Sequence, residues 1–182
     1  MIKLTIKTVI YAALLAAVTA VLAQIAIPLP GGVPFTLQVF AVFLGIFLLG
    51  KKSFWGMLTY LLLGAIGLPV FAQARGGIGV ILGPTGGYLL GFALSGLIGG
   101  FIVERSNFNI GGKILAVLVS LILIYSLGTI QLAYILKLPL SKAIAVGVKP
   151  FVPWDIIKGV MAILLATHLQ KALTNAGVKL NG

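Results

Sequence analysis

The chain has 182 residues, of which 60% are hydrophobic and only 8% are charged. Soluble domains are typically about 45–50% apolar and about 25% charged, so this composition excludes a soluble globular domain and predicts a polytopic membrane protein. Thirteen basic residues stand against two acids, Glu104 and Asp155, for a formal net charge of +11, and there is no cysteine. The chain therefore lacks the side chains for a carboxylate metal cluster, a two-carboxylate active site or a thiolate site.

A membrane span needs about 20 mostly apolar residues, and the spans are predicted from stretches with few or no charges. No charge lies between Thr8 and Gly50, and the prolines and glycines of 28–34 divide this stretch in two. The first span lacks a small-residue cleavage region and is expected to stay in the membrane rather than serve as a signal peptide. The sequence predicts an all-α protein with six transmembrane helices in one domain, 1–182, and spans at about 8–27, 35–50, 53–69, 86–103, 114–136 and 152–171.

Basic residues predict how the chain is oriented. Eight lie at one end of the predicted spans: Lys3, Lys7, Lys51, Lys52, Arg105, Lys113, Lys171 and Lys179. Four lie at the other end: Arg75, Lys137, Lys142 and Lys149. Both termini are therefore expected in the cytoplasm. The outer loops 70–85 and 137–152 are long, rich in glycine and proline, and basic, so an anionic solute from outside would meet them first.

Two ionisable residues interrupt the sixth span, and charges inside spans mark functional sites by default. Asp155 and Lys158 are three residues apart and therefore share one helix face. Alternatively, Asp155 is favoured by the helix dipole and Lys158 only neutralises it or extends outward. We favour a functional pair because Lys158 lies deeper and opposes the dipole. His168 has no second histidine or nearby acid, so we expect an interfacial residue and not a metal ligand.

A glycine-rich stretch at 83–87 precedes the fourth span. It lacks the Gly-Lys-Ser/Thr ending of a phosphate loop, so no ATP site is predicted. One interpretation is a tight turn at a helix entry. The other, which we favour, is that its backbone lines a ligand cavity, where irregular chain at membrane depth is tolerated.

Small residues recur at every fourth position of the first span. Ala12, Ala16 and Ala20 form one stripe, with Ala13 and Ala17 beside it. This spacing lets another helix approach closely. It is equally compatible with packing inside the bundle and with a docking face for another membrane subunit.

Four motifs together resemble the BioY family, the biotin-binding S component of energy-coupling factor transporters. They are PFTLQVF at 34–40, YLLLGAIGLPVFA at 60–72, GPTGGYLLGF at 83–92, and Asp155-x-x-Lys158. The likeness covers most of the chain and is densest in 34–92. The resemblance implies a multi-pass protein of the bacterial plasma membrane that captures biotin at its outer side, without enzymatic activity, metal or cofactor. It also implies a transmembrane coupling subunit and two ATPases as partners, docked on an alanine stripe of the first span.

The resemblance also implies roles for individual residues. Asp155 would accept a ureido N–H of biotin, while Lys158 would donate to the ureido carbonyl or pair with the carboxylate tail. Thr36, Gln38 and Tyr88 would add polar contacts, and the backbone near Gly83 would line the cavity. Pockets are mostly apolar, so Phe35, Phe71 and Trp154 would pack the rings. Arg75 would bind the carboxylate tail or belong to the lid, which is loop 28–34 or loop 70–85.

Two other classes of function remain open. A stand-alone carrier or channel for an anionic solute is the first, although no inverted repeat of broken helices is visible. A membrane enzyme is the second, although two acids and one histidine supply little acid–base chemistry. The residues alone indicate a small, amphipathic, anionic solute.

Overall fold

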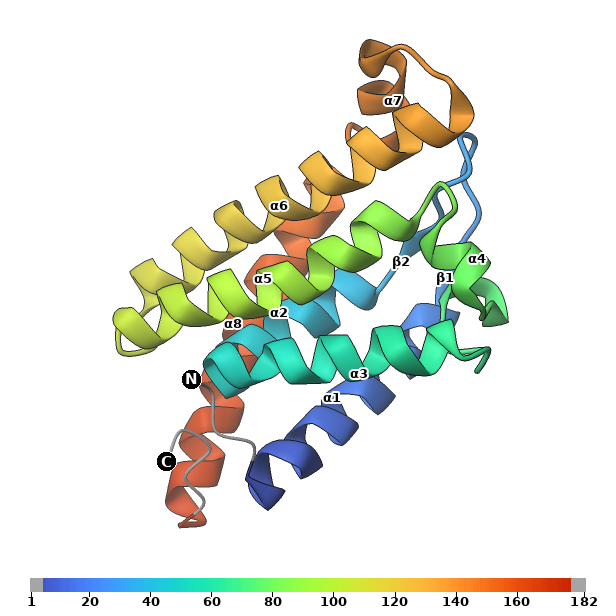
Figure 1. Ribbon diagram of the computed structural model, residues 1–182. Helices are drawn as coiled ribbons and strands as arrows, with labels where there is room; N and C mark the ends of the chain where they lie inside the picture. Colours follow the sequence, from blue (N-terminus) through green and yellow to red (C-terminus); the bar gives the residue numbers. More distant parts are fainter. Residues whose placement is uncertain (1–4, 178–182) are drawn as a thin grey trace.

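The computed structural model describes residues 5–177, so Lys3 and Lys179 lie outside the described part. Helices dominate it, as the sequence predicts (Figure 1). Within 5–177, the helices of 12 residues or more are α1 (Ile6–Gln24), α2 (Gln38–Leu49), α3 (Ser53–Ala65), α5 (Gly86–Arg105), α6 (Ile110–Leu136) and α8 (Val152–Asn175). Each overlaps one of the predicted ranges.

Five helical stretches in 5–177 are long and apolar enough to cross a membrane. One of them, Gln38–Ala65, has 28 residues and includes both α2 and α3. The chain reverses between these two helices at the 3-10 turn η1 (Gly50–Lys52), so they form a hairpin (Figure 1). Gly50 has a φ of 57°, which favours glycine, and a Cβ there would overlap the Glu104 side chain.

α2 has 12 residues and α3 has 13, so each is shorter than the roughly 20 residues of a full span. The range predicted from residue 35 begins as a helix only at Gln38. The reason is that β2 (Phe35–Thr36) pairs antiparallel with β1 (Ala26–Ile27), which keeps those residues extended.

The short elements gather at one end of the molecule. β1, β2, α4 (Ile78–Ile81) and α7 (Leu140–Gly147) lie there, opposite the α2–α3 and α5–α6 turns (Figure 1). The 3-10 turn η2 (Ala72–Ala74) belongs to the same region. Loops 70–85 and 137–152 are therefore partly helical, and they surround the entrance described below.

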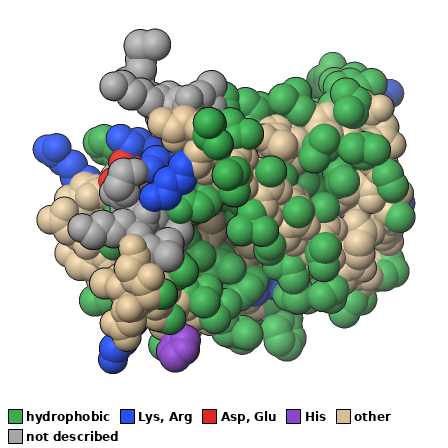
Figure 2. All heavy atoms as spheres, turned by 90° about the horizontal axis from the view of Figure 1, so that it is seen from below, with side chains coloured by type: hydrophobic (Ala, Val, Ile, Leu, Met, Phe, Trp, Pro, Cys, Tyr) green, Lys and Arg blue, Asp and Glu red, His purple; other side chains and the backbone are tan. Residues whose placement is uncertain are grey.

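The surface divides into an apolar band and a charged end. In the view of Figure 2, hydrophobic side chains cover much of the surface, and most of the visible lysine and arginine side chains lie at one end, beside the visible acidic side chain. Glu104 belongs to that end, where its carboxylate contacts the Lys51 ammonium group at 2.9 Å. This surface is that of a multi-pass membrane protein.

The core lies between α2, α3, α5 and α6. Its largest fully buried side chains are Tyr60, Phe43, Phe47, Phe71, Ile46, Met57 and Ile124. α5 and α6 pack closely because Gly91 sits against the Cα of Ile124, where a Cβ would not fit. Ile124 also lines the cavity described below, so this packing positions part of its wall.

Candidate functional site

An open cavity lies beside strand β2, with about 700 Å³ of empty space including the part open to solvent. Its walls come from α2, α5, α6 and α8, and from the segments around Pro34 and Phe71. Of the ten residues predicted to bind ligand, seven line it: Thr36, Gln38, Phe71, Arg75, Tyr88, Asp155 and Lys158. These seven residues come from four separate stretches of sequence that meet at one site.

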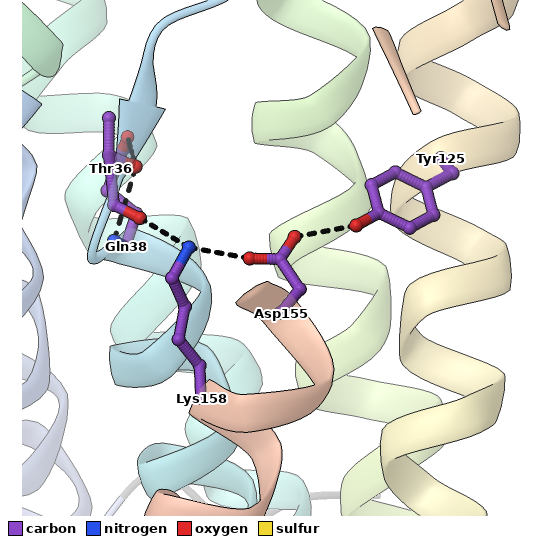
Figure 3. A network of polar contacts seen from close by, with 5 residues as sticks. All are labelled: Thr36, Gln38, Tyr125, Asp155 and Lys158. Atoms are coloured by element: carbon purple, nitrogen blue, oxygen red, sulfur yellow. Dashed lines mark hydrogen bonds and ion pairs between the residues drawn. The ribbon is translucent and has the colours of Figure 1, made fainter. Parts of the chain in front are cut away.

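Asp155 and Lys158 form a buried ion pair on the first turns of α8. The Lys158 ammonium nitrogen lies 2.6 Å from Asp155 Oδ1, and the two side chains are only 6% and 4% exposed. Lys158 also donates to the backbone carbonyl of Thr36 at 2.7 Å (Figure 3). Burying two charges costs desolvation free energy, which good geometry and further hydrogen bonds must offset. α8 is thereby joined to strand β2, just before α2 begins.

Tyr125 on α6 forms a second hydrogen bond with the Asp155 carboxylate. Its hydroxyl donates to Asp155 Oδ2 at 2.7 Å, so each carboxylate oxygen has one fixed partner (Figure 3). Tyr125 also lines the cavity. Tyr125 was not among the residues predicted from the sequence, because a tyrosine inside an apolar helix is not unusual by itself. The one signal in the sequence was that Tyr125 is the single tyrosine between Ile114 and Gly128.

Thr36 and Gln38 begin a second polar chain. The Thr36 hydroxyl donates to Gln38 Oε1 at 2.9 Å, and Gln38 Nε2 donates to the Tyr60 hydroxyl at 2.7 Å. The Tyr60 hydroxyl donates in turn to the Val70 carbonyl at 3.0 Å. Tyr60 is fully buried and was not predicted, although it lies in one of the family-like motifs. The chain fixes the Gln38 amide at the cavity wall.

Phe35 and Trp154 lie beside the ion pair but are not part of the cavity lining. The Phe35 ring lies 4.0 Å from the Lys158 ammonium nitrogen, a cation–π contact. Trp154 meets Phe35 edge-on, with ring centroids 6.0 Å apart, and is 56% exposed. Neighbouring residues of a helix point in different directions, so Trp154 cannot share the inward face of Asp155.

The glycine-rich stretch contributes less than expected. The Gly83 carbonyl accepts from Gln131 Nε2 at 2.7 Å and does not line the cavity. Thr85 does line it, and Tyr88 lines it while donating its hydroxyl to the Gly147 carbonyl at 2.9 Å. The glycine-rich stretch thus mainly forms a tight turn before α5, and within it Thr85 reaches the cavity.

Both candidate lid loops border the cavity. Val33 and Pro34 come from loop 28–34, and Phe71, Gln73 and Arg75 from loop 70–85. Phe71 is almost completely buried, whereas Arg75 is exposed at the rim. Arg75 therefore places a positive charge at the entrance and not at the floor.

The two alanine registers of α1 point in different directions. Ala12 and Ala16 are buried inside the bundle, where α1 packs on α3, and Ala20 is half-buried. Ala13 and Ala17 are exposed. A partner helix can reach the second register, while the first serves internal packing.

At the end of the helices opposite the cavity, Lys113 is buried. The sequence had counted it among the basic residues that orient the chain in the membrane. Its ammonium group donates to Thr167 and Gln170 of α8, each at 3.0 Å. His168, on the same helix, is exposed, in line with an interfacial position. This end joins α6 to α8 and is separate from the cavity.

The arrangement favours binding of a small amphipathic solute. Asp155 offers acceptor oxygens, Lys158 and Arg75 offer positive donors, and Leu89, Phe92 and other apolar side chains form the walls. Such a mixture of a mostly apolar lining with a few fixed polar groups is typical of a ligand pocket.

Comparisons with known proteins agree with this geometry. A relative from Thermotoga maritima, named "Biotin transporter BioY", is 46% identical over 168 residues, which cover 91% of this chain and 96% of the relative. A relative from Pyrococcus horikoshii, named "Probable biotin transporter BioY", is 42% identical over 165 residues, covering 90% and 96%.

A solved structure has the same fold. It is the crystal structure of the S-component for biotin from an ECF-type ABC transporter, and it matches with a TM-score of 0.83 at 28% identity, covering 93% of this chain and 95% of that one. The family model for the BioY family matches residues 1–175. This chain therefore belongs to the BioY family.

Proposed function

We propose that this protein is the biotin-binding subunit of an energy-coupling factor transporter and that it captures biotin at the outer side of the cell membrane. The observation that carries the proposal is the buried Asp155–Lys158 pair at the wall of an open cavity. The names of the curated relatives and of the matching crystal structure supply the identity of the ligand.

The ureido ring of biotin fits the ion pair. It has two N–H donors and one carbonyl acceptor, so Asp155 accepts an N–H while Lys158 donates to the carbonyl. Lys158 has three N–H donors, of which two already reach Asp155 and the Thr36 carbonyl. One donor therefore remains for a ligand without breaking the ion pair. Hydrogen bonds to charged groups are the stronger ones.

The rest of the ligand follows the walls of the cavity outward. The thioether ring packs on apolar side chains such as Phe71, Leu89 and Phe92. The carboxylate tail points to the rim, where Arg75 is exposed and can pair with it. Gln38, Thr36 and Tyr88 provide further polar contacts.

Calorimetric titration of the purified protein tests this proposal with biotin, thiamine, riboflavin and pantothenate. We expect saturable binding of biotin at one site and no binding of the other three. Asp155→Asn removes a charged acceptor and should weaken biotin binding about tenfold or more. Glu104→Gln, which changes the other acid at the far end, should leave the affinity unchanged. Absence of biotin binding, or equal affinities for Asp155→Asn and the wild type, would contradict the proposal.

Transport requires partners, because the sequence has no phosphate-loop motif. The proposed partners are a transmembrane coupling subunit and two ATPases, docked on the exposed register of α1 that includes Ala13 and Ala17. In this assembly six helices cross the membrane and both termini face the cytoplasm. Vesicles with this protein alone should show no ATP-dependent biotin accumulation, whereas vesicles with the coupling module should. Accumulation by the protein alone would favour a stand-alone carrier.

A further inference from the structure

We propose that Gln24, the last residue of α1, is a positioning residue that holds one wall of the cavity in place and thereby slows release of the ligand. The wall in question is the segment Val70–Arg75, called here the rim segment. The inference rests on the proposed function for the identity of the ligand, biotin, but the contact itself is independent of it.

The Gln24 side chain binds the rim segment with both ends of its amide. Its Oε1 accepts from the Ala74 backbone N–H at 2.9 Å. Its Nε2 donates to the Ala20 carbonyl of α1 at 3.0 Å and to the Phe71 carbonyl at 3.3 Å, and it lies 3.5 Å from the Val70 carbonyl. The amide oxygen of Gln24 accepts from Ala74, and its amide nitrogen donates to Phe71. One side chain therefore joins both ends of this turn to α1.

The rim segment needs such a restraint because its backbone is strained. Gln73 and Ala74 have φ values of 62° and 54°, the left-handed region that residues with a Cβ disfavour. Strained conformations persist only where the surroundings hold them. Within the segment itself, the Phe71 N–H donates to the Arg75 carbonyl at 2.9 Å, which closes the turn.

Four residues of the strained turn line the cavity: Phe71, Ala72, Gln73 and Arg75. Two side chains from other elements form hydrogen bonds with its backbone, Tyr60 and Gln24. The Tyr60 hydroxyl binds the Val70 carbonyl from α3, and this contact belongs to the polar chain of the cavity. Gln24 provides the attachment from α1 and does not itself line the cavity. Removing it should loosen the rim segment without changing any lining side chain.

The position of Gln24 also connects two regions with different roles. α1 carries Ala13 and Ala17, the exposed register proposed for docking. A shift of α1 against the bundle would therefore reach the cavity wall through Gln24. The residue links the proposed docking helix to ligand release.

The test replaces Gln24 with methionine, which has similar length and cannot make these hydrogen bonds. Biotin dissociation is followed by chasing bound labelled biotin with an excess of unlabelled biotin. We expect dissociation about three- to tenfold faster than in the wild type, with an unchanged association rate. Val21→Met, one turn earlier on the exposed side of α1, is the matched control and should dissociate at the wild-type rate.

Backbone hydrogen exchange of the ligand-free protein gives a readout without biotin. The Ala74 amide and its neighbours in the rim segment should exchange faster in Gln24→Met, while amides of α3 and α5 stay protected. Unchanged exchange in the rim segment, or faster exchange with unchanged dissociation, would overturn the inference. If the wild type binds no biotin, the proposed function fails, whereas the exchange result still decides whether Gln24 holds the rim segment.

Discussion

Asp155 has both carboxylate oxygens engaged, one by Lys158 and one by Tyr125. An acceptor held from two sides is oriented before a ligand arrives, so less ordering is needed on binding. The pair Asp155 and Lys158 was visible in the sequence, because charges inside an apolar span are rare. The role of Tyr125 was not visible in the sequence, because its side chain reaches Asp155 only through the way α6 packs beside α8.

Tyr125→Phe tests the orienting contact at the scale of one atom. It removes a hydrogen bond to a charged group, and we expect biotin affinity to fall about tenfold. Tyr134→Phe, on the same helix but 82% exposed, should bind as the wild type does. Calorimetric titration of both variants gives the comparison. Equal affinities for Tyr125→Phe and the wild type would mean that Asp155 needs no such orientation.

Among the elements, α3 depends on a close contact with the segment that follows it. Gly64 lies directly beneath the Phe71 ring, and a Cβ at Gly64 would overlap that ring. Phe71 also meets Tyr60 edge-on, with ring centroids 5.4 Å apart. The glycine therefore lets the Phe71 side chain fill the space between α3 and the cavity.

Gly64→Ala tests this packing. The added methyl group must displace a buried ring, and overpacking of this kind typically costs about 1–3 kcal/mol of stability. We expect a lower midpoint of thermal unfolding in detergent and weaker biotin binding. Gly79→Ala on α4, where nothing lies within 4 Å of the new methyl group, is the control and should retain both properties. A fully stable Gly64→Ala protein with wild-type affinity would contradict this view of the contact.

α1 illustrates what helical spacing leaves undecided. The sequence contains two adjacent alanine stripes, and both have the spacing for close helix approach. Only the packing of α1 on α3 distinguishes them, by burying Ala12 and Ala16 and exposing Ala13 and Ala17. The choice depends on helix rotation, which composition and spacing do not fix.

Ala17→Trp should block docking through the exposed register. A large ring at a position that requires close approach separates the two helices, so we expect co-purification with the coupling subunit to fall at least about tenfold. Biotin binding by the isolated protein should be unchanged. Leu164→Trp, at another exposed position on α8, is the control and should assemble normally. Normal assembly of Ala17→Trp would place the docking face elsewhere.

Across the whole molecule, the cavity and the charged end lie at opposite ends of the helices. The sequence predicted the all-α membrane fold because charge-free stretches separated by glycine, proline and basic residues are strong signals. It overestimated the second span, since residues 35–36 form strand β2 instead of a helix. It also missed the buried position of Lys113, because burial at a helix end depends on partners from a distant helix.

The central claim is that the Asp155–Lys158 pair recognises the ureido ring of biotin at the wall of this cavity. A crystal structure of the protein with bound biotin tests it most directly. We predict the ureido ring within hydrogen-bond distance of Asp155 and Lys158, and the carboxylate tail directed to the rim near Arg75. Biotin bound in the reverse direction, with its carboxylate on Lys158 and its ureido ring at the rim, would contradict the account, as would biotin bound outside the cavity.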